Sequence, residues 1–121
     1  MEYGEDVYTT LKGEVKEECG LNIESIKPRM DIETEGKYGK VSVAFVPFCG
    51  EQFLGSNYIG FVFVCTAKGE LTQKGLYDAK EPRWVKLSKL KKILSKESEK
   101  IYPFHLGALK YYVEQKEKGR V

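Results

Sequence analysis

Three glutamates near the start of the chain have the side-chain type and spacing that can bind a divalent metal ion. Glu14, Glu17 and Glu18 are three and four residues apart, so on a helix they share one side. Glu14 then faces two like charges, and each such pair destabilises an isolated helix by about 0.2–0.5 kcal/mol. Magnesium or manganese, which prefer oxygen ligands, would relieve this repulsion. From spacing alone, the stronger alternative is a solvated acidic face balanced by Lys12 and Lys16.

A helix over residues 6–19 is expected to position these glutamates. Its apolar stripe recurs every four residues and consists of Val7, Leu11, Val15 and Cys19. Asp6 can cap the start, and Gly20 can supply the left-handed residue that ends the helix. Gly13, in the middle, costs about 1 kcal/mol relative to alanine. Packing of the stripe must therefore hold this helix.

The rest of the chain is predicted to mix strands with two further helices. Strands are expected at 22–34 with a break at Pro28, at 40–48 in a mostly buried position, at 58–67, and at 82–87 around Trp84. Loops are expected at 49–57 and 68–80. Helices are expected at 89–96, capped by Ser88, and from Pro103 onwards, with Leu106, Leu109 and Val113 on the inner face. This order favours a mixed sheet covered by helices over an all-parallel sheet.

The bulk composition is typical of one soluble globular domain over residues 1–121. Hydrophobic residues make up 41% and charged residues 31%, which excludes disorder, and the length suffices for a single core. The net charge of +2 argues against a stable nucleic-acid complex. No apolar run approaches the ~20 residues that a membrane span needs. The three cysteines, without a secretory signal, are expected to be reduced thiols in a cytoplasmic protein.

Charge is distributed unevenly along the chain. Residues 1–20 contain six acidic residues and two lysines, whereas residues 86–100 contain six lysines and two glutamates. The acidic segment could bind a metal ion, and the basic segment could bind phosphate. From charge alone, two solvated faces explain the same pattern more simply.

The stretch from Gly13 to Leu21, GEVKEECGL, resembles the end of the Nudix signature, G-x5-E-x7-R-E-U-x-E-E-x-G-U, in which U is bulky and apolar. Glu5 stands where the first glutamate of the signature belongs, and Gly20 stands at the late glycine. Asp78 to Val85 is similar to the acidic loop that precedes a strand near a tryptophan in that family, and the closing helix also fits.

The resemblance implies a fold, an activity and a set of site residues. The fold would be α/β, of the α+β kind: a Nudix-like α/β/α sandwich with a mixed β-sheet that lacks the first strands. The activity would be Mg²⁺- or Mn²⁺-dependent hydrolysis of a nucleoside diphosphate linked to another moiety. The implied site consists of Glu14, Glu17 and Glu18 as catalytic metal ligands, Glu5 as a supporting residue, and Asp78 or Glu81 as an assisting loop acid.

Two departures from the signature leave other functions open. Gly13 stands where the family has an arginine that orients the first glutamate of the Glu-x-x-Glu-Glu set, and only Lys12 is near enough to substitute in part. The first signature glycine would lie before Met1, so we expect the reading frame to begin upstream. Without the first strands the sheet would have an unpaired edge, which would favour a homodimer. The alternatives are a catalytically impaired Nudix-fold binding or regulatory module, and an unrelated α+β interaction domain.

Aromatic and basic side chains outside the motif have structural roles as their first expectation. Trp84 can stack on a base but is more often a core residue, and Tyr58, Phe61 and Phe63 are more often sheet core than a substrate platform. Arg29, Arg83 and the lysines at 89, 91 and 92 can contact phosphate, although solvation is their default role. His105 is expected at the surface or as a cap.

Overall fold

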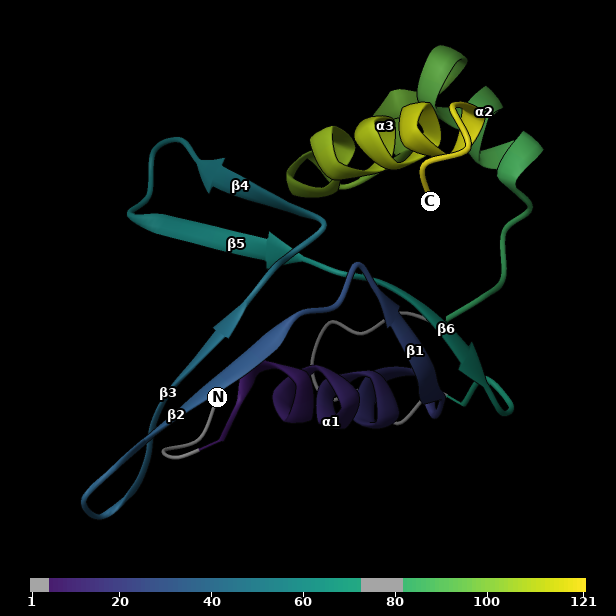
Figure 1. Cartoon of the computed structure of the whole chain (residues 1–121). Coiled ribbons are helices and arrows are strands. Elements are labelled where there is room, and N and C mark those ends of the chain that lie inside the picture. The colour runs from purple at the N-terminus through teal and green to yellow at the C-terminus, as the bar shows by residue number, and fades with distance from the viewer. Residues whose placement is uncertain (1–4, 73–81) are drawn as a thin grey trace. The chain divides into compact units, whose positions relative to one another are not determined.

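The computed structural model describes residues 5–72 and 82–121, and it has an α+β fold (Figure 1). Its helices are α1 (Val7–Cys19), α2 (Leu87–Lys96) and α3 (Pro103–Glu117), with a 3₁₀ turn, η1 (Ser98–Lys100). Its strands are β1 (Asn22–Lys27), β2 (Asp31–Gly36), β3 (Gly39–Phe45), β4 (Cys49–Phe53), β5 (Tyr58–Val62) and β6 (Val64–Lys68). The strands pair antiparallel as β1–β6, β2–β3 and β4–β5.

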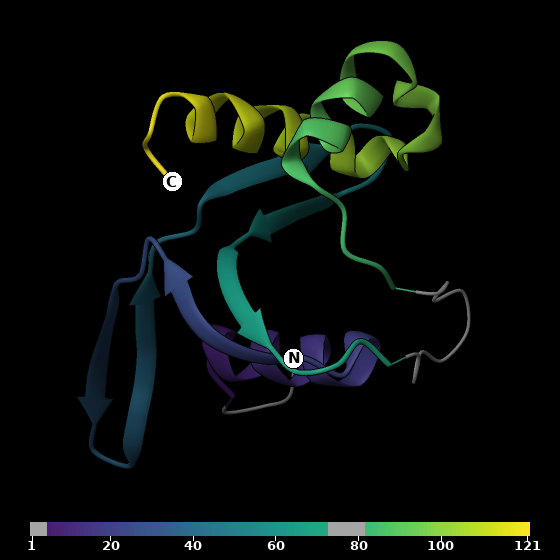
Figure 2. The same ribbon diagram turned by 90° about the vertical axis from the view of Figure 1, so that its right-hand side faces the viewer.

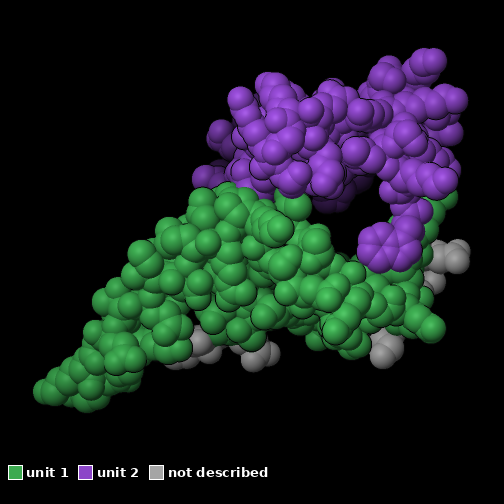
Figure 3. Space-filling view, turned by 45° about the vertical axis from the view of Figure 1, so that its right-hand side comes forward, with its two compact units in different colours: residues 1–47, 63–83 green, residues 48–62, 84–121 purple. Residues whose placement is uncertain are grey.

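The chain forms two compact units, shown in different colours in Figure 3. Unit 1 consists of residues 1–47 and 63–83, and unit 2 consists of residues 48–62 and 84–121. The prediction of a single domain over residues 1–121 stays a prediction.

Unit 1 packs α1 against the β1–β6 pair. Among the described residues of this unit, Tyr8, Leu21 and Ile26 are the buried apolar side chains, and Tyr8 is only 3% exposed. The Phe63 ring lies 5.8 Å from the Tyr8 ring, centroid to centroid, and 5.9 Å from the ring of Phe45. The β2–β3 hairpin extends from this core, and in Figures 1 and 2 its turn points away from α1. All residues of β2 are exposed, so this strand contributes little to the core.

Unit 2 packs α3 across the β4–β5 hairpin and against α2. The Glu51 carboxylate of β4 accepts a hydrogen bond from the backbone N–H of Ala108 in α3 at 3.0 Å. The Phe53 and Phe104 rings stack at a centroid distance of 4.7 Å. Ala108 and Gln115 are the buried residues of α3. This hydrogen bond and the aromatic packing together join the hairpin to the helix.

Several predicted boundaries are confirmed. The first helix begins after Asp6 and ends before Gly20, and the strand region after it breaks at Pro28, where β1 gives way to β2. The last helix has Pro103 in its first turn. Leu106, Leu109 and Val113 are partly buried on it, as expected for an inner face. These boundaries coincide with capping or proline residues, whose backbone preferences are local.

Other predictions are wrong, mainly where tertiary pairing decides the outcome. The expected loop at 49–57 contains β4, because Cys49 to Phe53 pair with β5. The expected strand at 58–67 is divided at Phe63 into β5 and β6, which pair in different units. The strand predicted at 40–48 is present as β3 but is mostly exposed, since only the hairpin partner β2 pairs with it in the described residues.

The segment before α2 also differs from expectation. Residues 82–86 form no strand, and Trp84 is 69% exposed rather than part of a core. Tyr58 and Phe61 are likewise exposed. Helix α2 begins at Leu87 with Lys86 at its N-cap position, so Ser88 lies inside the helix and does not cap it.

The predicted mixed sheet is absent from residues 5–72 and 82–121, where every strand pair is antiparallel. In the same residues, no helix combines the length and the apolar character that crossing a membrane requires.

Candidate functional site

Both ends of α1 are fixed by local contacts that the sequence encodes. The Asp6 carboxylate accepts a hydrogen bond from the Thr9 backbone N–H at 2.7 Å, and this bond is the main reason that the pKa of Asp6 is lowered. At the other end, Gly20 has φ of 77° and donates its N–H to the Lys16 carbonyl at 2.9 Å. A Cβ at Gly20 would collide with the Thr72 hydroxyl, so glycine is required both by conformation and by space.

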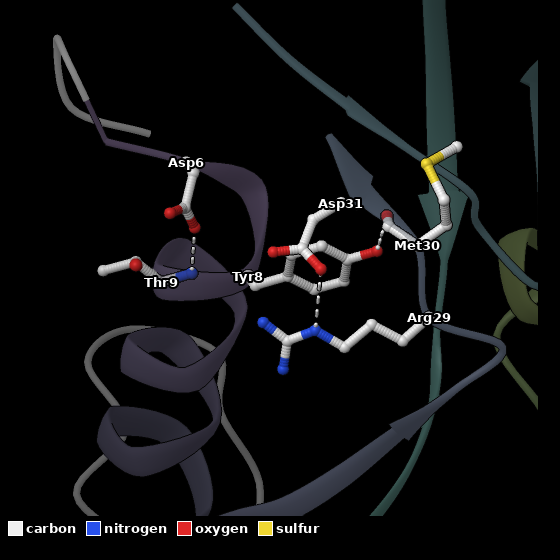
Figure 4. Close-up of polar contacts among 6 residues, drawn as sticks. All are labelled: Asp6, Tyr8, Thr9, Arg29, Met30 and Asp31. Carbon is white, nitrogen blue, oxygen red and sulfur yellow. Dashed lines mark hydrogen bonds and ion pairs between the residues drawn. The ribbon is translucent and has the colours of Figure 1, made fainter. Parts of the chain in front are cut away.

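Tyr8 anchors the inner side of α1 to the segment between β1 and β2. Its hydroxyl donates to the Met30 carbonyl oxygen at 2.8 Å, and the Arg29 guanidinium lies 4.4 Å from the centre of its ring (Figure 4). The same guanidinium forms an ion pair with Asp31 at 3.5 Å. Solvation is the default expectation for Arg29, but its guanidinium instead makes a cation–π contact with the Tyr8 ring.

The sequence pattern indicates the inward position of Tyr8 but does not predict its contacts with Arg29 and Met30. Tyr8 is three residues before Leu11 and seven before Val15, so it belongs to the inward side of the helix at ordinary helical spacing. No pattern around Arg29 indicates its contact with Tyr8, because the two residues are brought together by the fold.

The three glutamates lie on the exposed side of the helix fixed in this way. Glu14, Glu17 and Glu18 are all exposed. In the described part of the chain, no hydrogen bond or ion pair occupies their carboxylates. Their side chains are thus available to a ligand from solvent.

Glu5, the predicted supporting residue, is placed at the start of the helix. Its carboxylate accepts a hydrogen bond from the Thr10 hydroxyl at 2.7 Å. This contact spans the first turn of α1, where a supporting residue would act. Lys12, the expected partial substitute for the signature arginine, is exposed. A Cβ built at Gly13 meets no atom within 4 Å, so the position has room for a larger side chain.

The donor set fits magnesium in its chemistry and only partly in its geometry. Carboxylate oxygens are the ligands that magnesium prefers. Within residues 5–72 and 82–121, however, no three acidic, histidine or cysteine side chains are arranged to hold an ion. Magnesium usually keeps several waters and is held by one or two carboxylates together with substrate phosphates, so three converging protein ligands are not required. The predicted loop acids Asp78 and Glu81 lie outside the described residues.

A hollow of about 290 Å³ in unit 1 lies at the N-terminal end of α1 and not at the three glutamates. Glu5, Asp6 and Val7 line one side, and residues of β2 and β3 line the other. Lys40 and Glu33 form an ion pair there at 2.7 Å. The hydrogen bond that the Lys40 ammonium donates to the Glu33 carboxylate raises the pKa of Lys40. The positive charge in this hollow is therefore already compensated.

The cysteines show no arrangement for nucleophilic catalysis. None of the three forms a disulfide. Burial raises the pKa of the Cys49 thiol, and the charge of Glu51 acts in the same direction, so its thiolate form is disfavoured. His105 lies beside the ring of Tyr102, at 5.7 Å between centroids.

Comparison with family models, with curated proteins and with solved structures finds no match to this chain.

Proposed function

We propose that this protein is a Nudix-type hydrolase that uses Mg²⁺ or Mn²⁺ to cleave a nucleoside diphosphate linked to another moiety. One observation carries the proposal. Three exposed carboxylates without partners in the described residues project from α1, which begins after Asp6 and ends before Gly20. Crowded like charges destabilise a helix, and a cation bound between these carboxylates would offset their repulsion.

The roles of the individual carboxylates follow from the signature positions. Glu17 and Glu18 hold the ion, and Glu14 either adds a third ligand or accepts a proton from the attacking water at its carboxylate oxygen. Glu5, bonded to Thr10, keeps the start of α1 in place. When bound, the ion neutralises charge on the diphosphate oxygens and makes a nearby water more acidic.

The same proposal includes a Nudix-like sandwich fold, a cytoplasmic location and an assisting loop acid. The α/β/α sandwich with a mixed sheet would need pairings beyond the antiparallel ones described. Three unpaired thiols favour the reducing cytoplasm as the location. Asp78 and Glu81 remain the proposed loop acids.

The decisive experiment compares Glu17→Gln with Glu24→Gln, since both remove one exposed negative charge from unit 1. Phosphate release from a panel of nucleoside diphosphate derivatives is measured with Mg²⁺, and Mn²⁺ affinity is measured alongside. Glu17→Gln should reduce activity by more than the roughly 10–100-fold typical for loss of an outer supporting residue, and it should weaken Mn²⁺ binding. It should fold as well as the parent, because it relieves repulsion with Glu14. Unchanged Mn²⁺ affinity would remove Glu17 from the site.

A second candidate is a binding module that keeps the site without turnover. Gly13 favours it, because glycine cannot supply the charged hydrogen bond that orients the first glutamate. Lack of phosphate release, together with micromolar Mg²⁺-dependent binding of a nucleoside diphosphate derivative, would establish this candidate. Lack of both Mn²⁺ binding and nucleotide binding would favour an unrelated α+β domain.

A further inference from the structure

Unit 2 has an open groove of about 620 Å³ between α2 and α3. This volume is within the range of about 300–1,000 Å³ that holds small-molecule ligands. Residues from both helices line the groove, among them the lysines Lys92, Lys96 and Lys110 and the apolar Leu94 and Val113. The groove belongs to one compact unit, and the helices that form it pack against each other. In Figure 2 these helices are the green and yellow ribbons.

The charges that line this groove are unbalanced. Both of its glutamates are already engaged by lysines: Lys91 pairs with Glu117 at 2.6 Å, and Lys118 pairs with Glu114 at 2.8 Å. In residues 5–72 and 82–121, no carboxylate pairs with the ammonium groups of the other lining lysines, which are Lys92, Lys96 and Lys110.

Two of these lysines face each other as like charges on one helix. Lys92 and Lys96 are one helical turn apart, an arrangement that costs about 0.2–0.5 kcal/mol on a helix. Lys96 gains some stabilisation from its place in the last turn of α2. Lys92 and Lys110 are not in the last turn of their helices, so the end of a helix does not explain them.

The groove also offers apolar surface beside the ammonium groups. Leu94 and Val113 are half-buried, and each contributes to its lining. A simple anion would use only the lysines, whereas a phosphorylated organic molecule would also cover these apolar side chains. Lysine binds phosphate as a point charge without a fixed geometry, which suits an open groove.

We propose that the groove between α2 and α3 binds a soluble small molecule that carries at least two phosphate charges and an apolar or aromatic part. Lys92, Lys96 and Lys110 contact the phosphates, and Leu94 and Val113 contact the organic part. Binding in this groove needs no metal and is independent of any hydrolase function of α1.

The test measures binding of ADP and of inorganic pyrophosphate to the full chain by calorimetry, with a chelator present so that α1 cannot contribute through a divalent ion. ADP should bind more tightly than pyrophosphate because of the apolar surface. Binding of both should weaken as salt rises from low to physiological levels, since the contacts are charge-based. Equal affinity for the two ligands would overturn the role of Leu94 and Val113, and no binding of either would overturn the site.

A matched pair of double variants locates the binding. Lys92→Gln with Lys110→Gln removes two groove charges, and Lys86→Gln with Lys89→Gln removes two charges from lysines that do not line the groove. The first should weaken ADP binding by about tenfold or more, because charge-assisted hydrogen bonds are the strong ones, and the second should change it less than about twofold. Equal losses would show diffuse attraction and not a site.

A vesicle experiment separates a soluble ligand from a lipid headgroup. Phosphatidylcholine vesicles with and without phosphatidylinositol bisphosphate are sedimented with the protein. The proposal expects no phosphoinositide-dependent sedimentation. Sedimentation that is lost in the Lys92 and Lys110 double variant, without ADP binding in solution, would assign the groove to a membrane surface and overturn the proposal.

Discussion

Gly13 stands in the middle of α1, one residue before Glu14, where the Nudix signature has an arginine. The site has room for a side chain, since no atom lies within 4 Å of a Cβ built there. Gly13→Ala and Gly13→Arg should each stabilise the fold by about 0.5–1 kcal/mol, because glycine is a poor helix former. If Glu14 belongs to a metal site, only the arginine variant should also raise Mn²⁺ affinity and hydrolysis, by roughly tenfold, as expected for an outer residue that orients a ligand. Thermal unfolding and Mn²⁺ titration check the two effects separately. An equal rise in both variants would attribute the gain to helix stability.

At the scale of the element, the ends of α1 determine how well it presents its carboxylates. The hydrogen bond from the Thr9 N–H lowers the pKa of Asp6, so the folded state favours the charged carboxylate. The stability that the charged Asp6 carboxylate contributes is therefore fully present above its pKa in the unfolded chain, roughly 4. This stability is lost as pH falls through the lower pKa of Asp6 in the folded protein. Asp6→Ala should cost about 1 kcal/mol at neutral pH, the usual value of a helix N-cap. Asp6→Asn, which keeps an acceptor but does not titrate, should retain most of the stability and lose this part of its pH dependence. Urea unfolding at neutral and acidic pH measures both variants. A parent protein with the same pH profile as Asp6→Asn would contradict the role of the carboxylate.

The same elements show what the sequence can predict. Helix α1 was predictable because Asp6, the apolar stripe and Gly20 act within a few residues of one another, and the exposed position of its glutamates follows from the same periodicity. Strand β4 was not predictable from its glycine-containing sequence, because its partner β5 and the contact of Glu51 with α3 stabilise it. The division of 58–67 at Phe63 likewise depends on which strand each half pairs with. The anchoring of α1 by Tyr8 and Arg29 depends on contacts between segments that are distant in the sequence, which local patterns do not encode.

At the scale of the whole molecule, strand edges that no other strand of residues 5–72 and 82–121 pairs with favour association with a second copy. An isolated two-stranded hairpin is marginally stable in water, and a free edge invites another strand. Strand β2 carries Asp31, Glu33 and Glu35, so pairing it with its own copy would bring like charges together. Strand β3 has Lys40 as its only charged residue and exposes 67% of Val41, which makes its edge the better surface for a twofold contact.

Sedimentation should therefore show a monomer–dimer equilibrium that depends on protein concentration. Val41→Lys should shift it towards monomer by at least about tenfold in Kd, because each copy of the strand loses an apolar contact and gains a like charge. Asn57→Lys adds the same charge in the exposed turn between β4 and β5 and should leave the equilibrium unchanged. If both variants shift the equilibrium equally, net charge controls the association and β3 is not the contact. A parent chain that stays monomeric at every accessible concentration would mean that the exposed edge of β3 is tolerated in water, with Lys40 acting as the charge that discourages pairing.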